Sequence, residues 1–120
     1  MKKSVALAAA LEAVTGLALM FDPSLVARLL LGDDLTGVGT ALGRVAGFGL
    51  FALGLACWPT SKAPSGVGPG LWALLTYNLL VTMYLLYLAI ASEWVGSLLW
   101  PGVALHAVLT LLLAGVVRVR

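Results

Sequence analysis

Residues 38–58 read VGTALGRVAGFGLFALGLACW, and this stretch decides the fold. It is almost entirely apolar and long enough to cross a bilayer, which takes a helix of about 20 residues. Its glycines recur at intervals of four, four and seven residues, at positions 39, 43, 47 and 54. That spacing places them near one face of a helix, where small residues let a neighbouring helix approach closely in lipid. The stretch therefore predicts a spanning helix that packs tightly against another helix through its glycine face.

The composition predicts a membrane protein. The chain of 120 residues is 62% hydrophobic and 10% charged, and its mean hydropathy is +1.08. A soluble domain carries about 25% charged residues, so this chain lacks the polar side chains needed to cover its surface in water. The net charge of +2 is too small to indicate a nucleic-acid partner. The single cysteine, Cys57, excludes an internal disulfide and is expected to be a small buried apolar residue.

Proline, glycine and charged residues divide the chain into its elements. We expect an all-α fold in a single domain, an integral membrane four-helix up-and-down bundle with a short interfacial amphipathic helix after the first span. The expected spans cover residues 4–21, 38–58, 71–92 and 97–117, and the interfacial helix covers residues 23–31. The intervening segment 59–70, PTSKAPSGVGPG, has the proline, glycine and serine content of a loop.

The short segment 23–31 carries its own start signal. Asp22 can cap a helix and Pro23 fits the first turn, while the proline disfavours continuation of the preceding helix. Leu25, Val26 and Leu29 fall on one side of such a helix. At nine residues it is too short to span a bilayer, so we expect it to lie along the interface.

The distribution of charge predicts the orientation. With four spans, one side of the membrane receives Lys2, Lys3, Lys62, Arg118 and Arg120, and the other receives Asp22, Arg28, Asp33, Asp34 and Glu93. Because basic residues accumulate on the cytoplasmic side, we expect a multi-pass protein of the cell (inner) membrane with both termini in the cytoplasm. The four tryptophans then fall at the two interfaces, as an aromatic belt requires.

Four polar residues lie inside the expected spans: Glu12, Arg44, Asn78 and His106. Because Glu12 interrupts the first apolar segment, we expect that segment to be a retained helix and not a cleaved signal peptide. At the helical rise, Glu12, Asn78 and His106 lie roughly 10–14 Å in from the helix ends and so share a layer near the midplane. Ionisable groups at that depth usually face protein or water, so we expect Arg44 to pair with Glu12.

Three interpretations of these polar residues stay open from the sequence. They tie the helices together as structural contacts, they form a polar site for binding or proton relay, or they contact another chain. Small or hydroxyl-bearing residues four positions away from them favour faces turned toward protein. One histidine and one glutamate make a poor metal site, so no metal ligand is predicted, and the cofactor is unknown.

Three tyrosines, Tyr77, Tyr84 and Tyr87, follow one another on the third expected span. They would line a pocket for a flat lipophilic ligand such as a quinone or a sterol-like lipid, or they would simply pack, with each hydroxyl bonded locally. The chain has no nucleophile motif, phosphate-binding loop, dinucleotide fingerprint or metalloprotease motif. No catalytic residue is predicted, and a non-catalytic role is favoured.

The first half of the chain resembles a known group of proteins. Residues 16–58 contain a glycine-bearing first helix, the break Phe21-Asp22-Pro23, a short amphipathic run and a glycine-rich helix with an early arginine, Gly43-Arg44-Val45. This order is similar to that of the small four-helix membrane proteins of the DoxX-like group. The resemblance implies a four-helix membrane bundle; some members of that group are accessory subunits linked to quinone-coupled sulfur oxidation or detoxification. It assigns no catalytic residue here.

A second similarity is to the small multidrug transporters, which use a membrane-embedded glutamate in the first helix, as at Glu12.

The sequence supports two candidate functions. The first is a non-catalytic protein that binds a lipophilic ligand or a partner subunit within or beside its bundle. The alternative is a proton-coupled exporter that acts as a dimer through Glu12. Membrane lipid is an expected partner, and a homodimer is expected to form through the third or fourth span, because the glycine face is occupied by the first.

Overall fold

A computed structural model describes residues 2–59 and 68–119, and in that part of the chain it contains five helices and no strand. They are α1 (Lys2–Phe21), α2 (Pro23–Leu31), α3 (Val38–Ala56), α4 (Pro69–Ala91) and α5 (Leu99–Val119). The four long helices are apolar and long enough to cross a membrane. The all-α prediction is confirmed, and each predicted segment corresponds to one helix with ends shifted by two residues or fewer.

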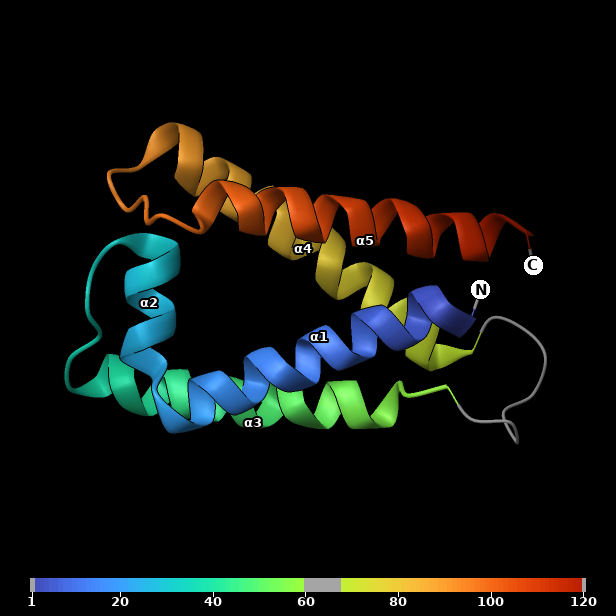
Figure 1. Cartoon of the computed structure of the whole chain (residues 1–120), viewed down its shortest axis with the longest axis horizontal. Helices are drawn as coiled ribbons and strands as arrows, with labels where there is room; N and C mark the ends of the chain where they lie inside the picture. The colour runs from blue at the N-terminus through green and yellow to red at the C-terminus, as the bar shows by residue number, and fades with distance from the viewer. Residues whose placement is uncertain (1, 60–67, 120) are drawn as a thin grey trace.

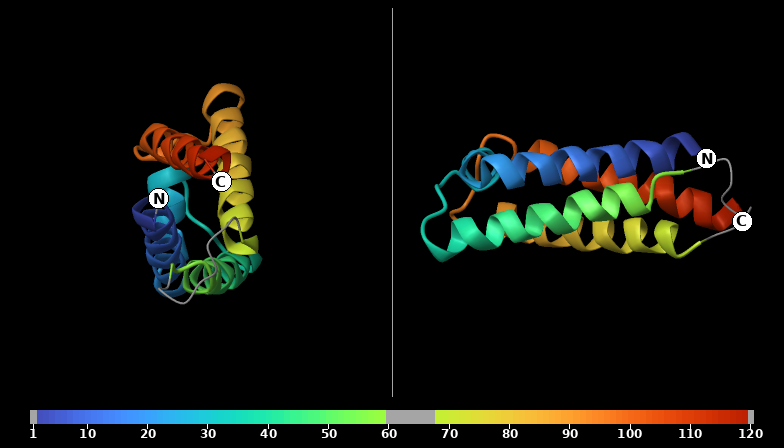
Figure 2. Two further views of the ribbon diagram at one scale, coloured as in Figure 1. Left: turned by 90° about the vertical axis from the view of Figure 1, so that its right-hand side faces the viewer. Right: turned by 90° about the horizontal axis from the view of Figure 1, so that it is seen from below.

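The helices form two antiparallel pairs, α1 with α3 and α4 with α5 (Figure 1). Viewed along the long axis, the α4–α5 pair lies beside the α1–α3 pair, and the N-terminus of α1 and the C-terminus of α5 lie at the same end (Figure 2). The contacts within each pair far outnumber those between the pairs. This loose junction between two tight pairs leaves room for a cavity.

The α1–α3 pair forms through the glycine face of α3. A Cβ atom on Gly47 would lie 2.7 Å from the Gly16 carbonyl oxygen, and one on Gly54 would lie 2.6 Å from the Ala9 carbonyl oxygen. Both distances are shorter than carbon can tolerate, so the two backbones touch only because these positions lack side chains. The prediction that the first span occupies the glycine face is confirmed.

Gly39 and Gly43, near the start of α3, contact other residues. A Cβ on Gly43 would lie 2.9 Å from the Pro23 ring, and one on Gly39 would lie 3.4 Å from Leu35. The glycine face is therefore shared between α1, the start of α2 and the α2–α3 connection. Gly47 is buried in these contacts and Gly43 is half-buried against Pro23, so little of this face remains for a second copy of the chain.

Helix α2 crosses the end of the bundle opposite the termini (Figure 1). As predicted, Asp22 caps it: its carboxylate accepts a hydrogen bond from the Leu25 N–H at 3.1 Å, and Pro23 occupies the first turn. The helix ends at Gly32, whose φ of 77° is left-handed and suits glycine. The side turned inward carries Pro23 and Ala27, both buried, while Leu25 remains 42% exposed.

The far end of α2 is bonded to the α4–α5 connection. The carbonyl oxygens of Leu29 and Leu30 accept hydrogen bonds from the N–H groups of Leu98 and Gly96, at 2.7 and 2.9 Å. Gly96 must be glycine, because a Cβ there would collide with the backbone of Leu29 and Leu30. The last carbonyl groups of a helix have no partner within it, so these two bonds join α2 to the second helix pair.

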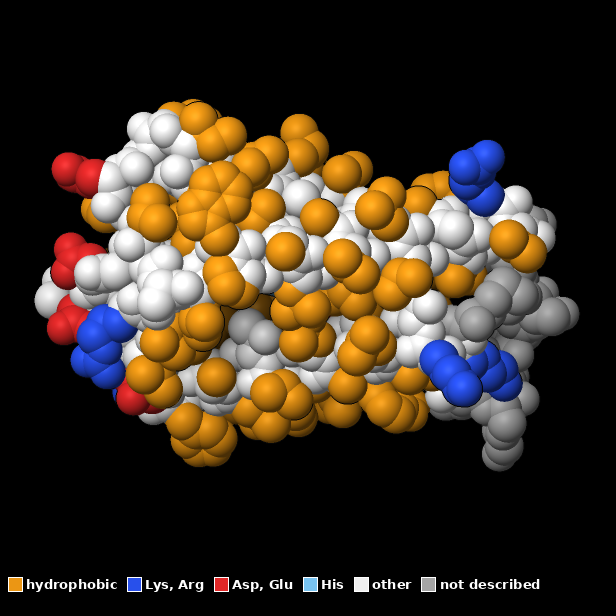
Figure 3. Space-filling model, turned by 45° about the horizontal axis from the view of Figure 1, so that its top comes forward, with side chains coloured by type: hydrophobic (Ala, Val, Ile, Leu, Met, Phe, Trp, Pro, Cys, Tyr) orange, Lys and Arg blue, Asp and Glu red, His pale blue; other side chains and the backbone are white. Residues whose placement is uncertain are grey.

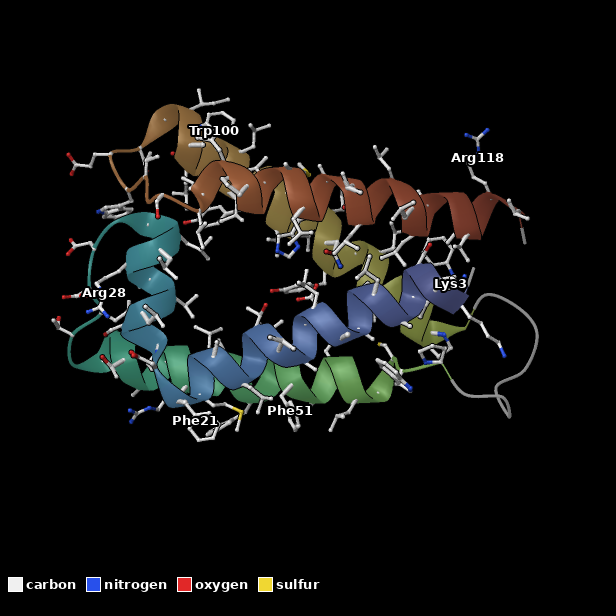
Figure 4. The ribbon with its side chains drawn as sticks, viewed as in Figure 1. Lys3, Phe21, Arg28, Phe51, Trp100 and Arg118 are labelled. Carbon is white, nitrogen blue, oxygen red and sulfur yellow. The ribbon has the colours of Figure 1, made fainter. Side chains whose placement is uncertain are left out.

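Charged side chains gather at the two ends of the molecule (Figure 3). Lys3 and Arg118 lie at the end that holds the termini of α1 and α5, and Arg28 lies at the opposite end (Figure 4). The acidic side chains on the visible face gather at that opposite end (Figure 3). The side chains of Phe21 and Trp100, which are 79% and 52% exposed, point away from the bundle, as expected for a surface that meets lipid. Lys62 lies outside the described residues.

Candidate functional site

Asn78 and His106 meet at mid-depth between α4 and α5. The His106 Nδ1 atom lies 2.7 Å from the Asn78 Oδ1 atom, and Asn78 is fully buried. The Asn78 Nδ2 atom donates to the Leu74 carbonyl oxygen at 2.9 Å. Tyr77 places its ring edge-on against the His106 ring, with centroids 6.3 Å apart. The structure therefore brings together three of the residues singled out by the sequence.

Glu12 joins this layer from α1. Its side chain is fully buried and lies near the Asn78 amide and Tyr77. Neither carboxyl oxygen, however, forms a hydrogen bond of acceptable geometry with any described residue. A buried polar group without a partner costs about 1–3 kcal/mol, so Glu12 needs an explanation other than helix packing.

Arg44 does not belong to the cluster, and the predicted Glu12–Arg44 contact is wrong. Arg44 is exposed, and the ion pair found among the described residues joins Arg28 to Asp34 at 3.1 Å on the surface. The reason is the register of the α1–α3 pair, in which Gly54 lies against Ala9 and Ala13. Arg44 is thus about nine residues from the level of Glu12, or roughly 13 Å along the helix axis.

An apolar core closes the bundle on the terminal side of the polar layer. It contains Ala8, Ala9, Cys57, Leu71, Leu74, Leu109, Leu113 and Val116. Each helix that contributes to the polar layer also contributes an apolar residue one turn nearer the termini: Ala8 below Glu12, Leu74 below Asn78, and Leu109 below His106. The polar groups therefore sit on an apolar base, and Cys57 is buried in that base as expected.

A cavity of about 590 Å³ opens on the other side of the polar layer. Side chains from α1, α2, α3, α4 and α5 and from the α2–α3 connection line it: Thr15, Leu19, Pro23, Val26, Ala27, Leu30, Leu31, Leu35, Leu50, Tyr77, Leu80, Val81, Tyr84, Leu85, Leu88 and His106. Figure 3 shows the molecule hollowed on this side. The wall is apolar apart from Thr15, the two tyrosines and His106.

Two of the three tyrosines of α4 lie at the cavity. Tyr77 and Tyr84 line the cavity, whereas Tyr87 is not among the lining residues. Tyr87 instead stacks on Tyr84, with ring centroids 6.2 Å apart and an angle of 23° between the rings. Tyr84 and Tyr87 are about 60% exposed, so this pair lies at the outer edge of the site.

The contribution of α2 was not foreseen from the sequence. Val26, Ala27, Leu30 and Leu31 line the cavity, and Leu25 and Leu29 face outward. The amphipathic pattern predicts a helix that lies along the membrane interface, but in the structure one side of α2 closes the end of the cavity. The structure buries Ala27, whose small side chain contributes little to an apolar side identified from its leucines.

The site offers binding chemistry. A concave apolar space of a few hundred cubic ångströms with a few convergent polar groups is typical of small-molecule sites. Among residues 2–59 and 68–119, no group of three or more His, Cys, Asp or Glu side chains is placed to hold a metal ion. Three of the polar lining residues, Thr15, Tyr77 and His106, lie toward the Asn78–His106 layer, and Tyr84 lies at the outer edge, so an elongated ligand would place its polar end against the first three.

Comparison with known proteins adds no assignment. The chain matches no protein-family model, no curated protein and no solved structure. The similarity to the DoxX-like group therefore stays a prediction from residues 16–58. What the fold defines is a class: a small all-helical protein with four helices suited to crossing a membrane.

Proposed function

We propose that this protein binds a lipophilic small molecule in the cavity between its two helix pairs. The observation that carries the proposal is the cavity of about 590 Å³, apolar along its walls and polar at one end. A bundle that only needed to be stable would fill this space with side chains, because an empty cavity removes packing contacts from the residues that line it. The unpartnered carboxyl group of Glu12 behind the polar end supports the same conclusion.

We also propose the setting in which the ligand binds. The protein lies in the cell membrane with the α1 and α5 termini in the cytoplasm, which is supported by Lys3 and Arg118 at that end. A single cysteine introduced at Lys3 should react with a membrane-impermeant thiol reagent only in inside-out vesicles, and one at Asp34 only in right-side-out cells. The reverse pattern would overturn this orientation.

Filling the cavity tests the proposal directly. Ala27→Phe adds a ring at a buried position of the cavity wall and is expected to weaken the binding of a tritiated C15 alcohol such as farnesol at least tenfold. The matched control is Leu25→Phe on the same helix, at an exposed position outside the cavity lining, where binding should be unchanged. Equal binding to Ala27→Phe and to the unsubstituted protein would contradict the cavity as the site.

A proton-coupled exporter remains the alternative, and the buried carboxyl group of Glu12 favours it. The Glu12–Arg44 pair expected from the sequence would neutralise this carboxyl group, but the structure places the two residues far apart. The two functions differ in a transport assay on reconstituted vesicles. If the protein only binds its ligand, we expect no efflux driven by a proton gradient, either with the unsubstituted protein or with Glu12→Gln. Efflux that disappears in Glu12→Gln would establish the exporter.

A homodimer is proposed through α4 or α5. Both helices expose large apolar side chains, among them Met83 and Ile90 on α4 and Leu111 on α5, whereas Gly47 and Gly54 of α3 are buried against α1. Cysteines at Ile90 or Leu111 should cross-link in native membranes. Strong cross-links from Gly49 on α3, with none from α4 or α5, would reverse this assignment.

A further inference from the structure

The hydrogen bonds of Asn78 determine which of its amide atoms meets His106. Its Nδ2 donates to the Leu74 carbonyl oxygen at 2.9 Å, so its Oδ1 is the atom 2.7 Å from His106 Nδ1. An amide oxygen can only accept a hydrogen bond. His106 Nδ1 must therefore carry the hydrogen and donate it, and Asn78 acts as a positioning residue for the ring.

This bond leaves the second ring nitrogen as an acceptor. In a neutral imidazole one nitrogen donates and the other accepts, so Nε2 of His106 retains a free lone pair. His106 has no ion-pair partner among the described residues, and an unpaired charge at membrane depth is unfavourable. His106 lines the cavity, and its Nε2 forms no hydrogen bond within the described part of the chain. The nitrogen is therefore available to a bound molecule.

Two hydroxyl groups near His106 already donate hydrogen bonds within the protein. The Thr82 hydroxyl donates to the Asn78 carbonyl oxygen and the Thr110 hydroxyl to the His106 carbonyl oxygen, both at 2.7 Å. The Glu12 carboxyl group lies behind the lining residues, and in its ionised form it can only accept hydrogen bonds. The hydroxyl groups of Thr15 and Tyr77 can donate or accept. The polar end of the cavity thus has more hydrogen-bond acceptors than donors.

We infer that the polar end of the ligand is a hydroxyl group that donates a hydrogen bond to His106 Nε2; this rests on the proposed binding of a lipophilic molecule in the cavity. A hydroxyl group brings one donor and no charge. An ammonium group would bring three donors and a charge, which the apolar walls desolvate at greater cost. A ketone, quinone or ether oxygen offers no donor. The ligand class is accordingly a lipophilic alcohol.

The chain has one histidine, so a single imidazole reports on the site. With ¹⁵N-histidine-labelled full-length protein in detergent, the ligand-free spectrum should contain one protonated and one unprotonated ring nitrogen. Farnesol should shift the unprotonated nitrogen upfield and bind about tenfold more tightly than farnesyl methyl ether. Tenfold corresponds to about 1.4 kcal/mol, the scale of one hydrogen bond. Asn78→Leu should reduce farnesol binding to the level of the ether.

The outcomes separate the two proposals. If farnesol and its methyl ether bind equally and the nitrogen does not shift, the hydroxyl contact is wrong but the cavity still binds lipophiles. If neither probe binds, the proposed function itself fails. Two protonated nitrogens in the ligand-free protein, or tighter binding of farnesylamine than of farnesol, would overturn the inference about His106.

Discussion

Replacing Gly47 with leucine is expected to lower the free energy of unfolding by about 3 kcal/mol or more, at the upper end of the usual cost of overpacking. A Cβ at position 47 would lie 2.7 Å from the Gly16 carbonyl oxygen and 2.9 Å from the Met20 backbone nitrogen. Both are backbone atoms, so no side chain can turn aside to relieve the collision. Helices α1 and α3 would have to separate along their whole contact.

The matched control is Gly49→Leu on the same helix. No atom lies within 4 Å of the position that its Cβ would take, so the side chain enters free space. Its unfolding free energy should equal or slightly exceed that of the unsubstituted protein, because leucine favours helix over glycine by up to about 1 kcal/mol. Unfolding in mixed detergent micelles, followed by circular dichroism, compares the two. Equal stability of the two variants would contradict the α1–α3 packing.

Replacing Glu12 with methionine is expected to raise the free energy of unfolding of the ligand-free protein by about 1–3 kcal/mol. Both carboxyl oxygens are buried without a partner, and an apolar side chain of similar size removes that cost. The same micelle titration measures it. A loss of stability in Glu12→Met would show that the carboxyl group has a partner and would contradict the geometry described here.

Arg44 provides the control for Glu12. Because the two residues are separated by roughly 13 Å along the helix axis, the effects of Glu12→Gln and Arg44→Gln should add within about 0.5 kcal/mol in the double variant. A coupling larger than that would restore the ion pair between them. A residue that costs stability and has no hydrogen-bond partner among residues 2–59 and 68–119 is typical of a site kept for function.

Much of the fold could be predicted from particular residues. The Asp22-Pro23 pair marks the end of α1 and the start of α2, and both the cap and the first turn form as expected. The glycine spacing on α3 predicts the contact with α1, because only small residues permit such an approach. The midplane layer follows from helical rise alone, which places Asn78 and His106 at matching depths.

The error at Arg44 and the unforeseen contribution of α2 to the cavity have physical causes. Depth along a helix can be counted from the sequence, but which residues of two helices meet depends on packing geometry, here the contacts of Gly16 and Gly54. Nor does the sequence show that α2 lies across the bundle, since that position depends on the backbone bonds from Gly96 and Leu98. The cavity arises from that placement.

The most direct measurement of the central claim is mass spectrometry of the protein extracted from native membranes in a mild detergent, under conditions that preserve bound lipophiles. The protein should carry one lipophilic molecule per chain, and Ala27→Phe should carry none while Leu25→Phe retains it. Protein that emerges without any bound lipophile, or Ala27→Phe that carries the same molecule as Leu25→Phe, would contradict ligand binding in the cavity.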